Sequence, residues 1–262
     1  MKKAALVFAE FPATRETRDK AFLSYPAAGW EFQDCDQIYN VAGESDWKPI
    51  ASNLKACGID AVVWVGSPDP NMENLLNAAR QVGFEPTLWA TDPNQYVSSF
   101  AQWNAENDGA ADNVYVRMTG VPFELADEAP AVQQYMDLVQ ASGGSIGLLG
   151  EESASAFLLW ATAAQACGSQ VTAKCVLDKA AEQKDWTGGG LHLPADPGTN
   201  SAPRCGMLLK LTGGDWEKVA PTDGLFECDD SFLVTGLQTD AVKAALMNAD
   251  RIATQFGTFE PA

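Results

Sequence analysis

Short apolar runs near the start of the chain have the length and spacing of β-strands. The strongest cover residues 4–8 and 61–66, where nearly every side chain is apolar. Shorter strands are predicted near residues 32–39 and at residues 87–90. A continuous apolar run of this length is typical of a strand that is buried on both faces, as in a parallel sheet.

Amphipathic segments with helical spacing separate these runs. Helices are predicted over residues 15–25, 45–58 and 72–83, with Ser45 as the N-cap of the second and Gly83 as the stop of the third. Strands that alternate with helices in this way predict an α/β fold with a doubly wound, Rossmann-like parallel sheet.

The pattern changes after residue 113. The elements predicted there are a strand over 114–118, helices around 132–139, 157–164 and 172–182, a β-hairpin with strands 206–211 and 216–219, and an amphipathic helix over 242–256. The second half of the chain therefore does not continue the regular strand–helix alternation.

Charge and composition exclude several classes of partner. The 262 residues are 46% hydrophobic and carry 17 basic against 35 acidic side chains, a net charge of −18. A surface this acidic repels nucleic acid and anionic membranes, so neither is expected as a partner. No apolar run reaches the roughly 20 residues that span a bilayer. Because His192 is the only histidine, a histidine-based metal site is not expected, and no cofactor is predicted.

Six cysteines are spread along the chain without a C-x-x-C pair, which argues against a zinc ribbon or a thioredoxin-type motif. An even number at these spacings fits three disulfides in an exported protein, and six buried thiols in a cytosolic protein are the alternative. The pairs nearest in sequence bracket plausible loops. We therefore predict the bonds Cys35–Cys57, Cys167–Cys175 and Cys205–Cys228.

The N-terminus resembles a signal peptide only in part. Lys2 and Lys3 precede a short apolar run, but Glu10 interrupts it below the length of about 7–15 residues that export requires. We interpret the run as the first strand. Either the protein is cytosolic, or the chain begins inside a longer exported precursor.

The sequence contains no motif for covalent, acid–base or phosphate chemistry. It lacks a P-loop, a dinucleotide-binding glycine motif after a strand, and a nucleophile elbow. His192 is predicted to be a structural residue on a short strand, and Glu151 with Glu152 to be charges at a helix N-terminus. No catalytic residue and no metal ligand is therefore expected.

The loops after three predicted strands carry the side chains of a small-molecule site. Ligands of open α/β sheets bind beyond the carboxyl ends of the strands. These ends offer hydroxyls, carboxylates and aromatic rings with few cations. The candidate ligand-binding residues are Phe11, Ala13, Thr14, Ser67, Asp69, Asp92 and Tyr96. The alternative is that Ser67, Asp69 and Asp92 only cap helices, as such residues often do.

Several motifs, taken in order, resemble a known family. They are the first strand, GESDW at 43–47, LKACGIDA at 54–61 leading into VVWVG, ACG at 166–168, WTGGGLH at 186–192, and the segment 203–209. Over residues 2–236 the chain resembles the type I periplasmic binding proteins, in particular the branched-chain amino acid (Leu/Ile/Val) receptors of ABC importers in their actinobacterial form.

This resemblance implies two lobes that close on a small ligand by a hinge motion. Residues 1–113 with 205–236 would form the second lobe, residues 114–204 would return to the first, and residues 237–262 would form a C-terminal amphipathic helix or tail. The chain would then be the truncated, C-terminal two-thirds of such a protein, with an incomplete first lobe. The return segment is expected to expose apolar surface and to self-associate.

The resemblance also implies ligand contacts. It assigns them to the loop 11–14, to Ser67 and to Asp92, whose carboxylate would neutralise an ammonium group of the ligand. This sequence has Ala13 and Ser67 where family members have tyrosines. The aromatic wall therefore differs, and an amino acid is one candidate ligand among small polar metabolites.

The function implied by the resemblance is that of a solute-binding component of an ABC importer, or a fragment of one, and not of an enzyme. Its partner in the full-length protein would be the transporter permease, and its location extracellular, on the cell surface or periplasmic. Two other functions are open from the residues alone: a flavodoxin-like α/β enzyme, and a sensory or interaction module that uses the same fold.

Overall fold

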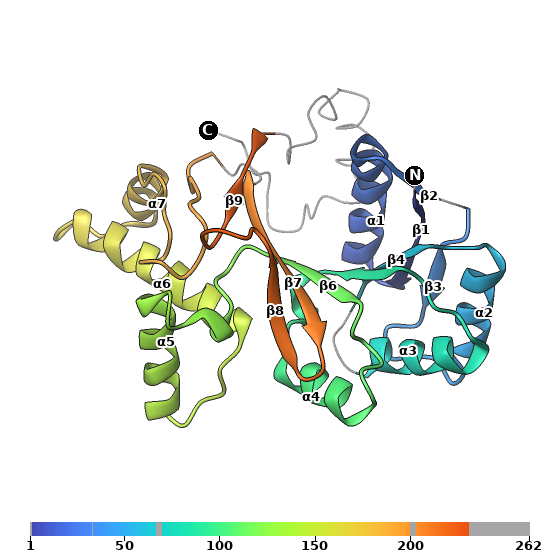
Figure 1. Cartoon of the computed structure of the whole chain (residues 1–262). Helices are drawn as coiled ribbons and strands as arrows, with labels where there is room; N and C mark the ends of the chain where they lie inside the picture. Colours follow the sequence, from blue (N-terminus) through green and yellow to red (C-terminus); the bar gives the residue numbers. More distant parts are fainter. Residues whose placement is uncertain (1, 33, 67–69, 200–202, 231–262) are drawn as a thin grey trace.

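A computed structural model describes residues 2–32, 34–66, 70–199 and 203–230 (Figure 1). The strands are β1 (Lys2–Ala9), β2 (Trp30–Phe32), β3 (Gln37–Tyr39), β4 (Ala61–Val65), β5 (Leu88–Thr91), β6 (Val114–Met118), β7 (Cys205–Thr212), β8 (Asp215–Ala220) and β9 (Glu227–Cys228). The α-helices are α1 (Pro12–Ser24), α2 (Lys48–Ala56), α3 (Asn71–Val82), α4 (Ser98–Glu106), α5 (Pro130–Ala141), α6 (Leu148–Ala166) and α7 (Ala173–Ala181). The 3-10 helices are η1 (Tyr25–Ala28), η2 (Pro93–Gln95) and η3 (Phe123–Leu125).

The described strands join into one open sheet with the order β2-β1-β4-β5-β6-β7-β8, in which β3 also pairs with β1 and β9 with β7. The pairs from β2 to β6 are parallel. The last two, β6–β7 and β7–β8, are antiparallel. The chain thus has the mixed α/β fold with a mostly parallel sheet that the sequence predicts.

Helices cover both faces of this sheet. On one face α2, α3 and α4 bury apolar side chains against Trp64 and Trp89. On the other face α1 packs Ala21 against Leu6 and Phe8. Every residue of β4 is buried, and a fully buried Val contributes about 1.5–3 kcal/mol relative to an exposed one. The burial of this interior strand therefore contributes to the stability of the sheet.

Between β6 and β7, the described residues leave the sheet and form a separate group of helices. After β6 the chain continues through η3, α5, α6 and α7, which lie on the opposite side of the β7–β8 hairpin from α1, α2 and α3 (Figure 1). These elements enclose their own buried cluster, which includes Val121, Val132, Tyr135 and Leu191. The chain then returns to the sheet as β7, beside β6.

One predicted strand is wrong in detail. The segment near residues 32–39 forms two short strands, β2 and β3, which pair with successive parts of β1. Cys35 and Asp36 lie in the break between them. The Asp36 carboxylate accepts the backbone N–H of Leu6 at 2.9 Å. A side chain thus makes the bond that a continuous strand would make there, and the backbone is free to turn toward the Cys35 disulfide.

Helix starts also differ from the prediction. α1 begins at Pro12, a favourable first helical position because proline lacks the N–H that would be unpaired there. Ser45 does not cap α2; the N-cap position is Trp47, and the Asp46 carboxylate accepts the backbone N–H of Lys48 at 3.0 Å. The helix α4 has no counterpart among the predicted elements. The helix predicted over 242–256 lies outside the described residues.

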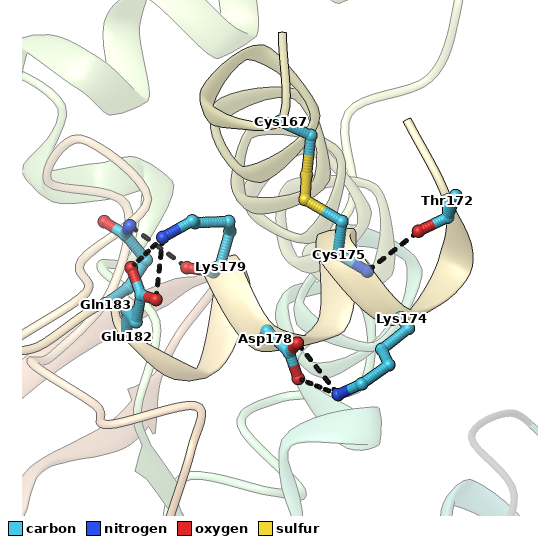
Figure 2. The surroundings of a disulfide bond; sticks show 8 residues. All are labelled: Cys167, Thr172, Lys174, Cys175, Asp178, Lys179, Glu182 and Gln183. Atoms are coloured by element: carbon cyan, nitrogen blue, oxygen red, sulfur yellow. Dashed lines mark hydrogen bonds and ion pairs between the residues drawn. A yellow bond between two sulfur atoms is a disulfide. The ribbon is translucent and has the colours of Figure 1, made fainter. Parts of the chain in front are cut away.

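The three predicted disulfides are present, and none of the six cysteines is free. The Cα–Cα distances are 6.5 Å for Cys35–Cys57, 6.1 Å for Cys167–Cys175 and 4.0 Å for Cys205–Cys228. Figure 2 shows the second bond, which joins the end of α6 to the first turn of α7. Among the described helices, none has the length and apolar character that crossing a bilayer would require.

Candidate functional site

The carboxyl ends of β1, β4, β5 and β6 meet at one edge of the sheet, because these neighbouring strands run parallel. The chain leaves this edge at Glu10, Gly66, Asp92 and Thr119. Segments that are distant in sequence therefore converge there, as the sequence predicts. The candidates Ser67 and Asp69 lie outside the described residues.

The segment that follows β1 is the start of α1 and not a free loop. Phe11 is its N-cap residue and is 52% exposed, and Ala13 in the first turn is exposed as well. The Thr14 hydroxyl lies 2.5 Å from the carbonyl oxygen of Ala9 and 2.7 Å from that of Phe11. Phe11 and Ala13 thus face solvent at this edge, whereas Thr14 uses its hydroxyl to hold the turn.

Asp92 caps the 3-10 helix that follows β5. Its carboxylate accepts the backbone N–H of Asn94 at 2.9 Å. Burial raises the pKa of Asp92, and the bond from Asn94 opposes this shift. Asp92 also raises the pKa of Tyr25, a smaller effect than the burial of that tyrosine. The capping role considered from the sequence is therefore present, and ligand contact by Asp92 stays a prediction.

Tyr96 is buried and makes both of its hydrogen bonds inside the protein. Its hydroxyl donates to the Glu124 carboxylate at 2.5 Å and accepts the backbone N–H of Phe123 at 2.8 Å. Burial and the adjacent Glu124 raise the pKa of Tyr96, so the phenol is protonated. Tyr96 therefore ties the carboxyl end of β5 to η3, and its ring packs against Phe123 and Trp216.

A cavity of about 920 Å³ lies beyond the end of β6, in the part of the chain where the sequence predicts no ligand residue. Its wall combines the end of β6, the first half of α6, the turns at 185–196 and the start of β7. Its lining residues include Thr119, Gly120, Glu151, Glu152, Ser155, Trp186, Leu191, His192 and Arg204.

A chain of hydrogen bonds forms one wall of the cavity. The Trp186 indole N–H donates to Ser155 Oγ at 3.0 Å, and Ser155 Oγ lies 2.7 Å from His192 Nε2. His192 Nδ1 lies 2.6 Å from the carbonyl oxygen of Leu193. Because a carbonyl only accepts, Nδ1 carries a proton, and in the neutral ring Nε2 then accepts from Ser155. Ser155 is 4% exposed, so this chain shapes the wall rather than presenting a nucleophile.

Gly188 is what allows this wall to close. It has φ +64°, and a Cβ there would lie 2.6 Å from Ser155 Oγ. A side chain at this position would be strained by the backbone and would displace the hydroxyl. Gly188 of the WTGGGLH segment therefore brings the backbone against α6, where the sequence suggests only a turn.

Glu151 is the exceptional polar group of the cavity. It is 2% exposed, and neither carboxylate oxygen has a hydrogen-bond partner among the described residues. Burial, with a smaller contribution from Glu152, raises the pKa of Glu151 to about 8. The predicted position at a helix N-terminus is confirmed, since Glu151 lies in the first turn of α6. The sequence did not indicate that α6 turns this side chain inward, whereas Glu152 is exposed.

The candidate residues at the sheet edge and the residues of the cavity adjoin through Tyr96. The charge of Glu151 contributes to the raised pKa of Tyr96, and Gly120, two residues beyond β6, lies against Glu151. The sequence predicts the sheet edge but not the cavity, which is formed by segments far apart in the chain. The available signal was weak: Glu151 and Ser155 stand four apart on one helix face.

Comparison with known proteins identifies the family. A family model described as periplasmic binding protein matches residues 1–215. No curated protein sequence matches the chain.

Solved structures with a similar fold include an ABC transporter substrate-binding protein from Aeropyrum pernix (TM-score 0.73, 18% identity, 94% of this chain and 63% of that one). Another is a branched-chain amino acid ABC transporter protein from Thermus thermophilus with bound valine (0.70, 15%, 88% and 62%). A third is an extracellular ligand-binding receptor from Rhodopseudomonas palustris (0.65, 15%, 83% and 62%).

The chain thus spans less than two-thirds of the length of each of these proteins. The matched family model covers most of the chain, whose sheet is open and mostly parallel. The chain belongs to the periplasmic binding protein family, of type I.

Proposed function

We propose that this chain is the solute-binding component of an ABC importer, or a piece of one, and that it binds a small polar metabolite such as an amino acid. Membership of the periplasmic binding protein family supports a binding role without catalysis. The structural neighbours, which include transporter substrate-binding proteins, support the same role. The partner would be the transporter permease, and the location periplasmic or extracellular.

In this proposal, the protein has two lobes. Residues 1–113 with 205–236 would form one lobe, residues 114–204 would belong to the other, and 237–262 would be a C-terminal tail. In support, β7 and β8 extend the sheet built by the first part, whereas η3, α5 and Leu191 share a separate apolar cluster. The ligand would bind where the carboxyl edge of the sheet faces the helical part.

The observation that carries this proposal is the convergence at the carboxyl edge. Phe11 and Ala13 are exposed there, and Asp92 follows β5, which is separated from β1 by β4. A carboxylate and an aromatic side chain are groups that a site for an ammonium-bearing ligand uses. We therefore assign Asp92 the ammonium group of an amino acid ligand.

The test is the Asp92→Asn variant, titrated calorimetrically with a panel of amino acids and polyols. We expect the affinity for an amino acid to fall by about 2–5 kcal/mol, the typical cost of breaking a desolvated charge pair. The affinity for a polyol should fall much less. Stability should hardly change, because asparagine caps a helix nearly as well as aspartate.

Asp127→Asn is the matched control, since Asp127 lies in an exposed turn and the substitution removes the same charge. Its amino acid affinity should equal that of the unchanged protein. Equal affinity of Asp92→Asn for a bound amino acid would reduce Asp92 to a helix cap. Failure of every amino acid to bind would contradict the proposed ligand class.

A further inference from the structure

Glu151 presents an unpaired buried carboxyl group to a cavity whose other buried polar groups are paired. Ser155, His192 and Trp186 satisfy one another and the carbonyl of Leu193. Both oxygens of Glu151 lack a partner within the described part of the chain. A buried carboxyl in this state costs free energy that a bound donor would recover.

We propose that this cavity binds a small amine and that Glu151 is the counter-ion of its ammonium group. The inference rests on the proposed solute-binding role and adds a second group for a cation: Asp92 is assigned the ammonium of an amino acid at the sheet edge, whereas Glu151 would bind an amine in the cavity. It also assigns recognition to α6, at a residue that the sheet-edge candidates do not include.

The protein itself supplies no cation for Glu151 in the described residues. The only basic side chain that lines the cavity there, apart from His192, is Arg204. Its Nη1 pairs with Asp230 at 2.9 Å, and its side chain is 63% exposed. Arg204 thus stands at the rim, and the buried carboxyl is open to a cation from outside.

Gly120 packs closely against Glu151 and Leu148. A Cβ at this position would lie 3.5 Å from Glu151 Oε2 and 3.2 Å from Leu148 Cδ1. Gly120 does not have a positive φ, so alanine is compatible with the backbone. The Gly120→Ala variant therefore narrows the approach to the carboxyl without changing its charge.

The rest of the wall fits an amine with an apolar body. Leu159, Leu191 and Leu193 line the cavity together with the Trp186 ring, and its volume of about 920 Å³ accommodates a small organic molecule. The other acidic residues of the lining are the exposed Glu152 and Asp185 and the half-buried Asp196, which pairs with Lys184. Buried Glu151 among apolar side chains therefore selects a cation with a hydrocarbon portion over a polyol or an anion.

Charged and titratable groups around Glu151 define how binding depends on pH. They are Glu152 on α6, the Tyr96–Glu124 pair, and Asp185, His192, Asp196 and Arg204 on the cavity wall. With its pKa raised to about 8, Glu151 loses a proton when an ammonium group binds. Binding should therefore tighten by about tenfold between pH 7 and pH 9, a range in which the amine stays charged.

The experiment uses two probes with one carbon skeleton, 3-methylbutylamine and 3-methylbutan-1-ol. Binding to the purified chain is followed by the indole N–H resonance of Trp186 in ¹H–¹⁵N spectra, identified with Trp186→Phe. We expect the amine to bind at least tenfold more tightly than the alcohol and to show the tenfold pH effect. Glu151→Gln should abolish both the preference for the amine and the pH effect, and Gly120→Ala should weaken the binding of the amine.

Glu152→Gln is the control, because it removes a carboxyl from the next residue, whose side chain is exposed; it should keep the preference for the amine. Equal binding of the two probes to the unchanged protein, no binding of the amine, or a preference that survives Glu151→Gln would each overturn the inference. None of these outcomes decides the Asp92 test, because an amino acid that depends on Asp92 could still bind at the sheet edge in each case.

Discussion

At the scale of single residues, Glu151 makes the folding stability depend on pH. Its pKa is raised from 4.5 to about 8 by burial and by Glu152. Between these values the folded protein holds a proton that the unfolded chain releases, so the free energy of unfolding falls as pH rises. The expected slope is about 1.4 kcal/mol per pH unit, ending above pH 8.

Urea unfolding at pH 5, 7 and 9 measures this slope. In Glu151→Gln the contribution should vanish, because glutamine has no titrating group, and the variant should be more stable than the unchanged protein at pH 9. Glu152→Gln should keep most of the slope. A stability profile of the unchanged protein identical to that of Glu151→Gln would contradict the burial of a titrating carboxyl.

At the scale of elements, α7 depends on its covalent link to α6. None of its residues is fully buried. Its polar contacts are the Thr172 cap and the exposed ion pairs Lys174–Asp178 and Lys179–Glu182 (Figure 2). Exposed ion pairs contribute about 0–1 kcal/mol each. The Cys167–Cys175 disulfide, which closes a short loop, is therefore the strongest restraint on this helix.

Replacement of both cysteines by serine should lower the free energy of unfolding by about 2–3 kcal/mol, the value for a short closed loop. Chemical denaturation followed by circular dichroism measures it. Lys174→Ala is the control and should cost less than about 1 kcal/mol, because it removes only one exposed ion pair. A smaller effect for the cysteine pair than for Lys174→Ala would show that packing against α6 positions α7 without the bond.

At the scale of the whole molecule, α6 exposes an apolar surface whose contact with water is unfavourable. Leu149, Phe157 and Trp160 lie along one face of the helix and are 68%, 62% and 53% exposed. The rings of Phe157 and Trp160 are 5.8 Å apart. The prediction that the return segment exposes apolar surface is confirmed, and its self-association stays a prediction.

Self-association should increase with salt, because the net charge of −18 repels copies of the chain and salt screens this repulsion. Light scattering from low to high ionic strength measures it. The Phe157→Ser/Trp160→Ser variant should remain monomeric at salt concentrations where the unchanged chain associates. Ile38→Ser, which removes an exposed apolar side chain from β3, is the control. A monomer at every ionic strength would contradict the prediction.

The sequence by itself determined the class of the fold and the covalent links. The strands β1, β4, β5 and β6 and the helix α3 follow from the local pattern of the sequence. The buried strand β4 is apolar at every position, whereas β6 alternates buried and less buried side chains. Each disulfide joins cysteines 8 to 23 residues apart, so local connectivity sufficed. The convergence at the carboxyl edge followed from parallel strands alone.

Only the tertiary structure decided which polar groups are buried and what they meet. Ser155 and His192 are 37 residues apart, and Tyr96 and Glu124 are 28 apart. Glu151 reads as a surface charge in its helix, yet α6 turns it toward Gly120. Periodicity records which side of an element is buried, whereas contacts between distant elements depend on how their faces meet. That is why the sheet edge could be predicted and the cavity beside α6 could not.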